Sequence, residues 1–344
     1  MKMGRLHSLL LLGLAVCSGW AQAPVAGTVE NLVRAVRAAL QELQADKQIA
    51  QTVEGIHLTA GLDDEVIEQL QAEGVGPLAT EALERLRDVS FRLPSSTAPL
   101  KLSATLAAPS AEEQSRVLEQ ARTWAMQYTA NLPNYVCTRE VSRYTKGKDP
   151  APWKIKEALT WELGYADRKD YQKLVAINGR PTKRKGTRGF TSGGEFGSFL
   201  GNVFQREPET KFQWSRWSNL RGCPTWVFSY HVDKKHSGFV LGTSGWITSR
   251  RVVTAIRGFV YIDSKTHQIM RIIYDADEIP SGFPMQGCCM LVDYGYVEIG
   301  ADKFLLPVRS TMRIVTKGVI GRNVTEFTKY RKFTSEVRVE FEKQ

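Results

Sequence analysis

Two clusters of side chains have the types and spacing that metal binding requires. His231 and His236 flank a Val-Asp-Lys-Lys turn, so that two imidazoles and the carboxylate of Asp233 would supply three ligands. The carboxylates of residues 275–278 follow a strand-like run and offer the oxygen ligands that calcium prefers. A polar hairpin turn explains the first cluster better. A solvated turn explains the second better, because no EF-hand loop surrounds it, and we therefore expect no metal.

Catalysis would need a nucleophile or a base with supporting groups, and the sequence lacks the motifs that supply them. It contains no G-x-S-x-G elbow, no H-E-x-x-H helix, no Walker loop and no G-x-G-x-x-G after a strand-like run. Histidines are few, with only four after residue 23. We therefore expect a protein that is not an enzyme and that binds no cofactor.

Aromatic side chains in the second half of the chain are better candidates for ligand contact. Large amphipathic rings on one face of a sheet suit either a thick core or an apolar ligand cavity. Residues 193–204 add a short apolar helix after a basic loop at 183–188. That helix would act as a lid, touch a membrane surface or complete the core. The candidate ligand-binding residues are Trp161, Phe196, Phe199, Leu200, Phe204, Trp214 and Trp226, and the candidate head-group residues are Lys183, Arg184, Lys185 and Arg188.

Residues 1–23 predict a secretory signal peptide. A basic start, an apolar core at 9–16 and an A-x-A site at 21–23 follow the pattern of exported proteins. The apolar run is too short to span a bilayer. Cys17, preceded by Leu-Ala-Val, resembles a lipoprotein box, although Val16 stands where a small residue is needed. We expect a periplasmic or secreted protein with a cleaved signal, and lipidation of Cys17 is an open alternative.

Four cysteines remain after processing, and an oxidising compartment permits disulfides. A bridge between Cys137 and Cys223 is one of several pairings. Cys288 and Cys289 are adjacent and would reach disulfide geometry with each other only under strain. The alternative is that all four are small buried apolar side chains.

Charge divides the chain into two regions of opposite sign. Residues 24–133 contain nine basic and fifteen acidic residues, a net charge of −6, whereas residues 134–344 contain thirty-five and twenty-one, a net charge of +14. A basic exported region meets anionic lipid head groups, cell-wall polyanions or its own acidic arm more readily than genomic nucleic acid. The partners we expect are a lipid or lipidated protein and an anionic membrane surface.

Residues 24–91 predict a small helical region. Helical spacing runs over 28–49, and two further helices flank the Gly-Val-Gly-Pro stretch at 74–77. This pair resembles the helix-hairpin-helix DNA-binding module, in which backbone N–H groups at a helix N-terminus hold a phosphate. Acidic residues follow over 81–88, where Lys or Arg would assist phosphate binding. Nucleic acid is therefore not an expected partner.

The rest of the chain predicts an antiparallel β domain. The Pro, Ser and Ala content of 92–109 indicates a linker, and Ser110 with Glu113 forms a capping box that begins a helix. From Tyr135 the helical period gives way to alternation over about ten strands, without the βα alternation of a parallel sheet. We expect an α+β fold in which 110–344 form a curved antiparallel half-barrel with a packed helix, after the small helical region.

The hairpin from Gly258 to Ile272, the strands that follow it through Val315 and the helix before Tyr135 resemble a known fold. They are similar to the periplasmic lipoprotein-carrier fold of LolA, LolB and related outer-membrane lipoprotein-sorting proteins. The resemblance implies an open half-barrel that wraps over helices and holds lipid chains in its concavity. Stretches such as 132–137 and 194–199 also resemble secreted bacterial proteins of unassigned function.

Two functions fit these observations. The first is an exported envelope protein that binds or carries an apolar or lipidated ligand on the concave face of the half-barrel. The alternative is a structural or interaction protein of the envelope with a filled core and no ligand. A cavity of several hundred Å³ lined by the aromatic side chains would favour the first, because ligand pockets are usually of that size. The oligomeric state is not indicated by the sequence.

Overall fold

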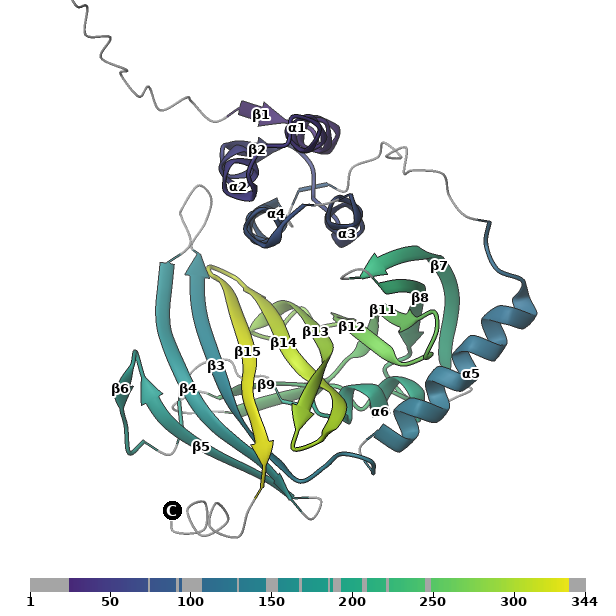
Figure 1. Ribbon diagram of the computed structural model, residues 1–344. Coiled ribbons are helices and arrows are strands. Elements are labelled where there is room, and N and C mark those ends of the chain that lie inside the picture. Colours follow the sequence, from purple (N-terminus) through teal and green to yellow (C-terminus); the bar gives the residue numbers. More distant parts are fainter. Residues whose placement is uncertain are drawn as a thin grey trace, which may run out of the picture. The chain divides into compact units, whose positions relative to one another are not determined.

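The chain forms two compact units, Met1–Leu102 and Ser103–Gln344, and the division falls within the predicted linker (Figure 1). The computed structural model describes residues 25–73, 75–90, 93–94, 107–128, 130–146, 154–166, 169–184, 186–187, 193–205, 209–220, 223–244 and 249–333. The predicted signal peptide with Cys17, most of the linker, Lys185 and Arg188 lie outside the described residues. Among the described residues, no helix is long and apolar enough to cross a membrane.

The first unit is helical, and the apolar faces of its helices form a core of their own. Its described elements are β1 (Val25–Gly27), α1 (Val29–Gln41), α2 (Asp46–Glu54), β2 (Ile56–Leu58), α3 (Asp64–Ala72) and α4 (Pro77–Ser90). Thr28 caps α1 by accepting a hydrogen bond from the backbone N–H of Asn31 at 3.3 Å. The prediction of one helix over 28–49 is wrong, because the chain leaves the helix after Gln41 and Leu43 takes a left-handed φ of 55°.

The N-terminus of α4 is capped from within the same unit. The carboxylate of Asp46 accepts hydrogen bonds from the backbone N–H groups of Leu78 at 2.8 Å and Ala79 at 3.1 Å. A Cβ added to Gly76 would lie 2.5 Å from the carboxyl carbon of Asp46, so the glycine permits this close approach. In the helix-hairpin-helix module a phosphate occupies this position, and here the protein's own carboxylate does.

The second unit is built on one antiparallel sheet of 11 strands in the order β6-β5-β4-β3-β15-β14-β13-β12-β11-β8-β7, with a separate ribbon of β9 and β10. Figure 1 shows the sheet curving around helix α6, which confirms the predicted α+β half-barrel with one strand more than expected. The strands are β3 (Tyr135–Lys146), β4 (Lys154–Ala166), β5 (Lys169–Ile177), β6 (Arg180–Pro181), β7 (Thr210–Leu220), β8 (Cys223–Val232), β9 (Val240–Ser244), β10 (Ser249–Val253), β11 (Ala255–Asp263), β12 (Ile269–Asp277), β13 (Met285–Ile299), β14 (Asp302–Thr316) and β15 (Ile320–Lys332).

The last described strand, β15, joins two groups of strands within this sheet. β15 pairs with β14 on one side and with β3 on the other, so that the early strands β3 to β6 join the later ones through the C-terminal part of the chain. The described part of the chain ends at Phe333, just after β15. The predicted hairpin of β11 and β12 is confirmed, with Val260 opposite Ile272.

Two helices pack on the sheet. Helix α5 (Ala111–Tyr128) begins with the predicted capping box: Ser110 Oγ accepts from the Glu113 N–H at 3.1 Å, and the Glu113 carboxylate accepts from the Ser110 N–H at 3.3 Å. The short helix α6 (Ser198–Phe204) shares one hydrophobic core with α5 and the strands.

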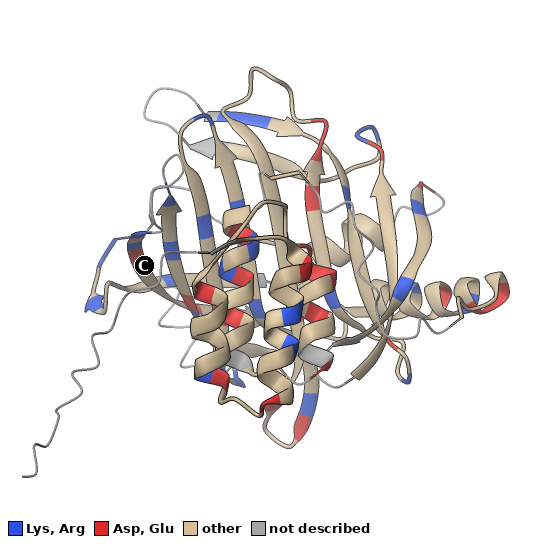
Figure 2. Ribbon diagram, turned by 90° about the horizontal axis from the view of Figure 1, so that it is seen from above, with Lys and Arg blue, Asp and Glu red and all other residues tan. Residues whose placement is uncertain are grey.

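Charged side chains are placed differently in the two units. Figure 2 shows acidic residues on the helices of the first unit, and some occupy first helical turns, as Glu30, Asp64 and Glu65 do. There they stabilise the partial positive charge of a helix N-terminus. On the strands of the second unit Lys and Arg are frequent, and three of them, Arg139, Arg143 and Lys146, are buried on β3.

Candidate ligand-binding cavity

Helix α6 and the residues just before it are held on the concave face of the sheet by two hydrogen bonds. Tyr274 of β12 donates a hydrogen bond from its hydroxyl to the carbonyl of Phe199. Tyr294 of β13 donates in the same way to the carbonyl of Glu195 at 3.0 Å. Burial raises the pKa of both phenols well above the ordinary value, so both remain protonated donors at neutral pH. The helix is therefore held in place by the sheet beneath it.

One part of the concave face, over β7, β8, β11 and β12, is filled by α6; we call it the filled end. Phe199 is 4% exposed and packs against the ring of Tyr274 at 4.7 Å between centroids. Phe204 is 1% exposed and stacks on Phe212 at 5.3 Å. Leu200, which lies between these two residues in the sequence, is also fully buried. The side chains that the sequence suggests as a lid thus form part of the core.

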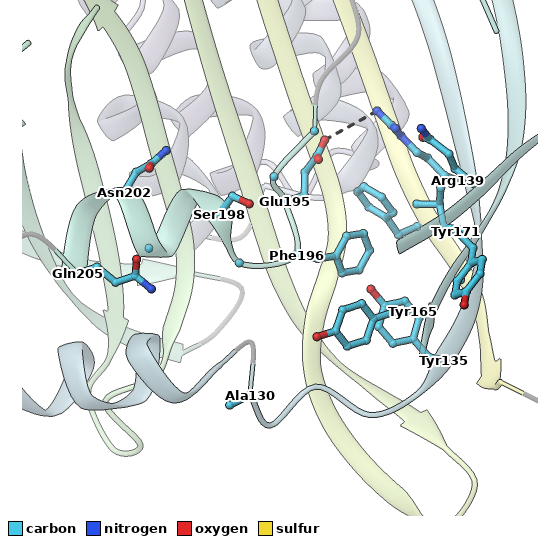
Figure 3. A pocket seen from close by; sticks show the side chains of 18 of the residues that line it. Ala130, Tyr135, Arg139, Tyr165, Tyr171, Glu195, Phe196, Ser198, Asn202 and Gln205 are labelled. Carbon is cyan, nitrogen blue, oxygen red and sulfur yellow. Dashed lines mark ion pairs between the residues drawn. The ribbon is translucent and has the colours of Figure 1, made fainter. Parts of the chain in front are cut away.

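The concave face over β3, β4 and β5 is different, and we call it the open end. It holds a cavity of about 800 Å³ between these strands, the C-terminal part of α5 and α6 (Figure 3). Small-molecule sites usually measure roughly 300–1,000 Å³. The apolar and aromatic side chains that line it include Tyr135, Leu163, Tyr165, Tyr171, Phe196 and Phe327.

Aromatic rings form a continuous wall of this cavity. Tyr135 stacks with Tyr165 at 5.8 Å between ring centroids and contacts Phe196 at 5.4 Å. Phe196 in turn meets Phe327 edge to face at 5.3 Å. Because Tyr135 and Tyr165 lie directly opposite each other on β3 and β4, strand register fixes their stacking. The wall is therefore rigid and suits an apolar chain or a ring.

Two opposite charges lie beside the aromatic wall. A guanidinium nitrogen of Arg139 lies 3.9 Å from Oε1 of Glu195 (Figure 3), and Ser310 donates a hydrogen bond to the same oxygen at 3.4 Å. The two side chains are 11% and 4% exposed. Charges so deeply buried require partners, because removing them from water costs several kcal/mol for each ion. A polar group of a ligand would find both signs of charge here.

Polar side chains of α6 complete the lining. Ser198, Asn202 and Gln205 project from successive turns of the helix and border the cavity (Figure 3). A hydroxyl and two amides provide donors and acceptors without a net charge. The cavity therefore combines an aromatic wall, one buried ion pair and a neutral polar rim, which is an arrangement suited to an amphipathic molecule.

The floor near the aromatic wall is dry. Burial raises the pKa of the Cys137 thiol to about 12, although a hydrogen bond with Tyr330 and the charge of Arg139 act in the opposite direction. Burial also raises the pKa of Tyr330 well above its ordinary value. Cys137 therefore stays a thiol at neutral pH and is a poor nucleophile.

The candidate ligand-binding residues fall into three places. Phe196 lines the cavity, whereas Phe199, Leu200 and Phe204 lie in the filled end. Trp214 and Trp226 also lie toward the filled end, at 5.8 Å between rings, in a cluster with Trp217. Trp161 belongs to a separate small cluster with residues such as Leu159 and Leu174. Most of the candidate residues therefore lie at the filled end, and of all the candidates only Phe196 lines the cavity.

Sequence reasoning did not single out the residues that define the cavity. Tyr135, Arg139 and Tyr165 lie on strands whose alternation is evident, and Glu195 lies in the glycine-rich segment before α6. The signal that would have found them is an Arg among apolar residues on the inward-facing positions of β3, because a charge there needs a buried partner.

The basic loop lies next to a second hollow of about 770 Å³, which Arg184 lines together with Lys156. Arg184 and Lys183 are exposed. Arg143 donates to the carboxylate of Glu157 at 2.7 Å and to the Thr187 hydroxyl at 3.2 Å, which ties the loop to β3 and β4. Lys185 and Arg188 lie outside the described residues.

The two histidines that the sequence suggests as metal ligands contact carboxylates, and the described cysteines form no disulfide. Nδ1 of His231 lies 3.4 Å from Asp233, and Nε2 of His236 lies 3.5 Å from Glu209. The part of the chain that the structure describes holds no group of three metal-ligating side chains. Its four cysteines form no disulfide, and Cys137 and Cys223 lie on different strands, β3 and β8, that are not neighbours in the sheet.

The sequence matches no family model and no curated protein. Among solved structures the chain is similar to a domain from Vibrio parahaemolyticus that is provisionally described as an outer membrane lipoprotein-sorting protein domain, with 13% identity over 66% of this chain and 97% of that one, at a TM-score of 0.32. The chain is also similar to a DUF1329 family protein from Desulfovibrio piger, with 9% identity over 64% of this chain and 93% of that one, at a TM-score of 0.29. It is similar as well to LprF from Mycobacterium bovis, with 12% identity over 65% of this chain and 95% of that one, at a TM-score of 0.20. Identities and TM-scores this low transfer no ligand and no residue role to this chain.

Proposed function

We propose that this protein is an exported binding protein that holds an amphipathic, lipid-like ligand in the cavity at the open end of its half-barrel. The observation that supports this proposal is the cavity itself, with a volume of about 800 Å³ and a stacked aromatic wall. An apolar surface of this kind gains free energy when a ligand replaces water, at about 25 cal/mol per Å² of apolar area. The polar groups at the rim would orient the ligand.

The place of the ligand differs from the one that the sequence suggests. The filled end offers no room, because Phe199, Leu200 and Phe204 are buried against the sheet. The ligand would instead lie beside α6, in contact with Phe196 on one side and with β3 and β4 on the other. In this arrangement α6 is a fixed wall of the site.

The rival function is a structural or interaction protein of the envelope that needs no ligand. The burial of the α6 side chains favours it, since they complete the hydrophobic core. In that case the cavity holds only water, and the aromatic wall stabilises the fold alone. The two functions therefore differ in one measurable respect, the occupancy of the cavity.

The direct experiment is extraction of the protein purified from its native envelope, followed by mass spectrometry for lipids, together with titration of a fluorescent fatty-acid probe. A variant that fills the cavity gives the specific control. Ser198 is exposed and lines the cavity, so Ser198→Trp should reduce probe binding by about tenfold or more. Ser115→Trp places the same ring on the exposed face of α5, away from the cavity, and should leave binding unchanged.

Three outcomes are distinguishable. Copurified lipid, with probe binding that only Ser198→Trp weakens, supports the proposal. Probe binding that both variants weaken equally, or that neither weakens, places the ligand elsewhere and contradicts the proposed site. No lipid and no probe binding leaves the structural function as the better explanation.

A further inference from the structure

We propose that the head group of the ligand is zwitterionic, with its anionic part bound by Arg139 and its cationic part by Glu195. This inference rests on the proposed function, because it concerns the ligand of the same cavity. Both side chains line the cavity, and both are about nine-tenths buried or more. They are therefore among the most deeply buried charges that a bound molecule can reach.

The Arg139–Glu195 pair is more open than comparable pairs of the same sheet. Its nitrogen–oxygen distance is 3.9 Å, longer than the roughly 2.7–2.9 Å of a charge-assisted hydrogen bond. Elsewhere, Arg143 approaches Glu157 at 2.7 Å, and Arg271 binds Asp293 through two hydrogen bonds at 2.8 and 3.2 Å. The buried Arg143–Glu157 and Arg271–Asp293 pairs are thus close, whereas the Arg139–Glu195 pair beside the aromatic wall is wider.

The backbone keeps the two charges in position. Arg139 lies on β3 in register with Trp161 and Phe327 on its neighbouring strands. The carbonyl of Glu195 accepts the hydrogen bond of Tyr294, which fixes the residue from below. A ligand would therefore meet two preorganised charges whose side chains need little reorganisation, which lowers the entropic cost of binding.

Charge balance selects the class of head group. The ion pair is neutral as a whole, so a singly charged ligand would add a net charge to a buried site and would face one like charge at close range. Burial of a net charge is costly, and like charges in a site of low dielectric repel strongly. A zwitterion satisfies the guanidinium and the carboxylate together and adds no net charge. The aromatic wall of Tyr135, Tyr165 and Phe196 remains for the acyl chain and for cation–π contact with a quaternary ammonium.

The test compares four single-chain amphiphiles with the same acyl or alkyl chain, each below its micellar concentration, by isothermal titration calorimetry on the purified protein. They are lysophosphatidylcholine (zwitterionic), lysophosphatidylglycerol (anionic), a monoacylglycerol (uncharged) and an alkyltrimethylammonium (cationic). We expect lysophosphatidylcholine to bind most tightly, by about tenfold over each of the others, because each of the others loses at least one contact between opposite charges.

Two variants should change the preference in opposite directions. Arg139→Gln leaves the carboxylate and should shift the preference to the cationic amphiphile. Glu195→Gln leaves the guanidinium and should shift it to the anionic one. Lys183→Gln removes an exposed charge that does not line the cavity and should keep the original order. A purely structural role for the pair would lower the affinity for all four amphiphiles together.

The remaining outcomes separate this inference from the proposed function. Equal affinity for all four amphiphiles, or tightest binding of the uncharged or a singly charged one by the unmodified protein, overturns the zwitterionic head group and leaves the binding function intact. Failure of all four to bind contradicts both. If one variant does not fold, the other gives the direction of the shift. If neither folds, the order of the four affinities for the unmodified protein decides.

Discussion

The filled end and the open end of the concave face belong to one sheet, yet only one of them leaves space for a ligand. The difference arises from the length and direction of a single segment. Helix α6 has seven residues, and its buried side chains cover the strands around Tyr274. The residues just before it, Glu195 and Phe196, turn toward β3 and line the cavity instead. A short insertion therefore fills one end of the face and builds a wall at the other.

Glycines make this change of direction possible. Gly194 and Gly197 have φ values of 109° and 135°, which side chains with a Cβ rarely adopt. The backbone of Phe199 then bonds back to the carbonyl of Gly194 at 3.2 Å. The comparison of the two ends teaches that a few residues of a connecting segment decide which part of the concave face is covered and which part borders a cavity.

The largest effect that we predict is alkaline unfolding, which tests whether the two ends share one dry core. Burial raises the pKa of Cys137, near the open end, and of Cys288 on β13 to about 12 each, from an ordinary value of 9.0. Because the folded-state pKa values are raised, the stability is full below about pH 9 and is lost as the pH rises toward 12. Circular dichroism against pH should show the fold lost over this window.

Thiol labelling sharpens the same comparison. If the cavity admitted water to the floor of the open end, Cys137 would ionise near its ordinary pKa and would react with iodoacetamide faster than Cys288. We expect both to react slowly at pH 8, since each thiolate is disfavoured by burial. Rapid labelling of Cys137 in the folded protein would contradict this prediction.

The next largest effect compares two phenylalanines of the same segment. Phe199→Ala at the filled end should lower the free energy of unfolding by about 3–5 kcal/mol, the usual cost of removing a buried ring. Phe196→Ala at the open end should cost clearly less, because that ring is only partly buried and already borders a cavity. Urea denaturation gives both values. Equal losses of unfolding free energy would mean that the two ends are packed alike. A small loss for Phe199→Ala would support the alternative that the helix is a mobile lid.

A smaller effect concerns the turn that divides the two ends. Gly194→Ala forces a Cβ onto a positive φ and places it 3.2 Å from the ring of Phe199, which should cost about 1–3 kcal/mol. Gly193→Ala is the matched control, since nothing lies within 4 Å of its added Cβ. If both substitutions have the same effect on the urea midpoint, the turn is not what separates the filled end from the open end.

The sequence predicts the scaffold of this molecule better than its site. Alternation over β11 and β12, and the capping box at Ser110 and Glu113, are local patterns that determine local structure, and both predictions are confirmed. The cavity depends on residues far apart in the chain, such as Arg139 and Glu195, which meet only through the order of the strands. Helical spacing of Phe199 and Phe204 correctly indicates an apolar helix, but a period does not tell whether that helix moves or stays packed.

The smallest effect on stability is expected at the basic loop beside the second hollow. Lys183 and Arg184 are exposed, so replacing both with Gln should change the free energy of unfolding by less than about 0.5 kcal/mol. Binding to vesicles that contain anionic lipid should nevertheless weaken, because each basic residue near such a surface contributes about 1 kcal/mol. Added salt should weaken binding further, since screening reduces the attraction between exposed charges.

The matched control for this loop is the pair Lys234 and Lys235, which are exposed in the turn after β8, at the other end of the sheet order. Replacing them with Gln lowers the net charge by the same amount but should leave vesicle binding nearly unchanged. If the two double variants lose vesicle binding equally, the protein responds to its total charge, and the basic loop has no special role. If only the Lys183 and Arg184 variant loses it, the basic loop is the part of the molecule that contacts the membrane surface.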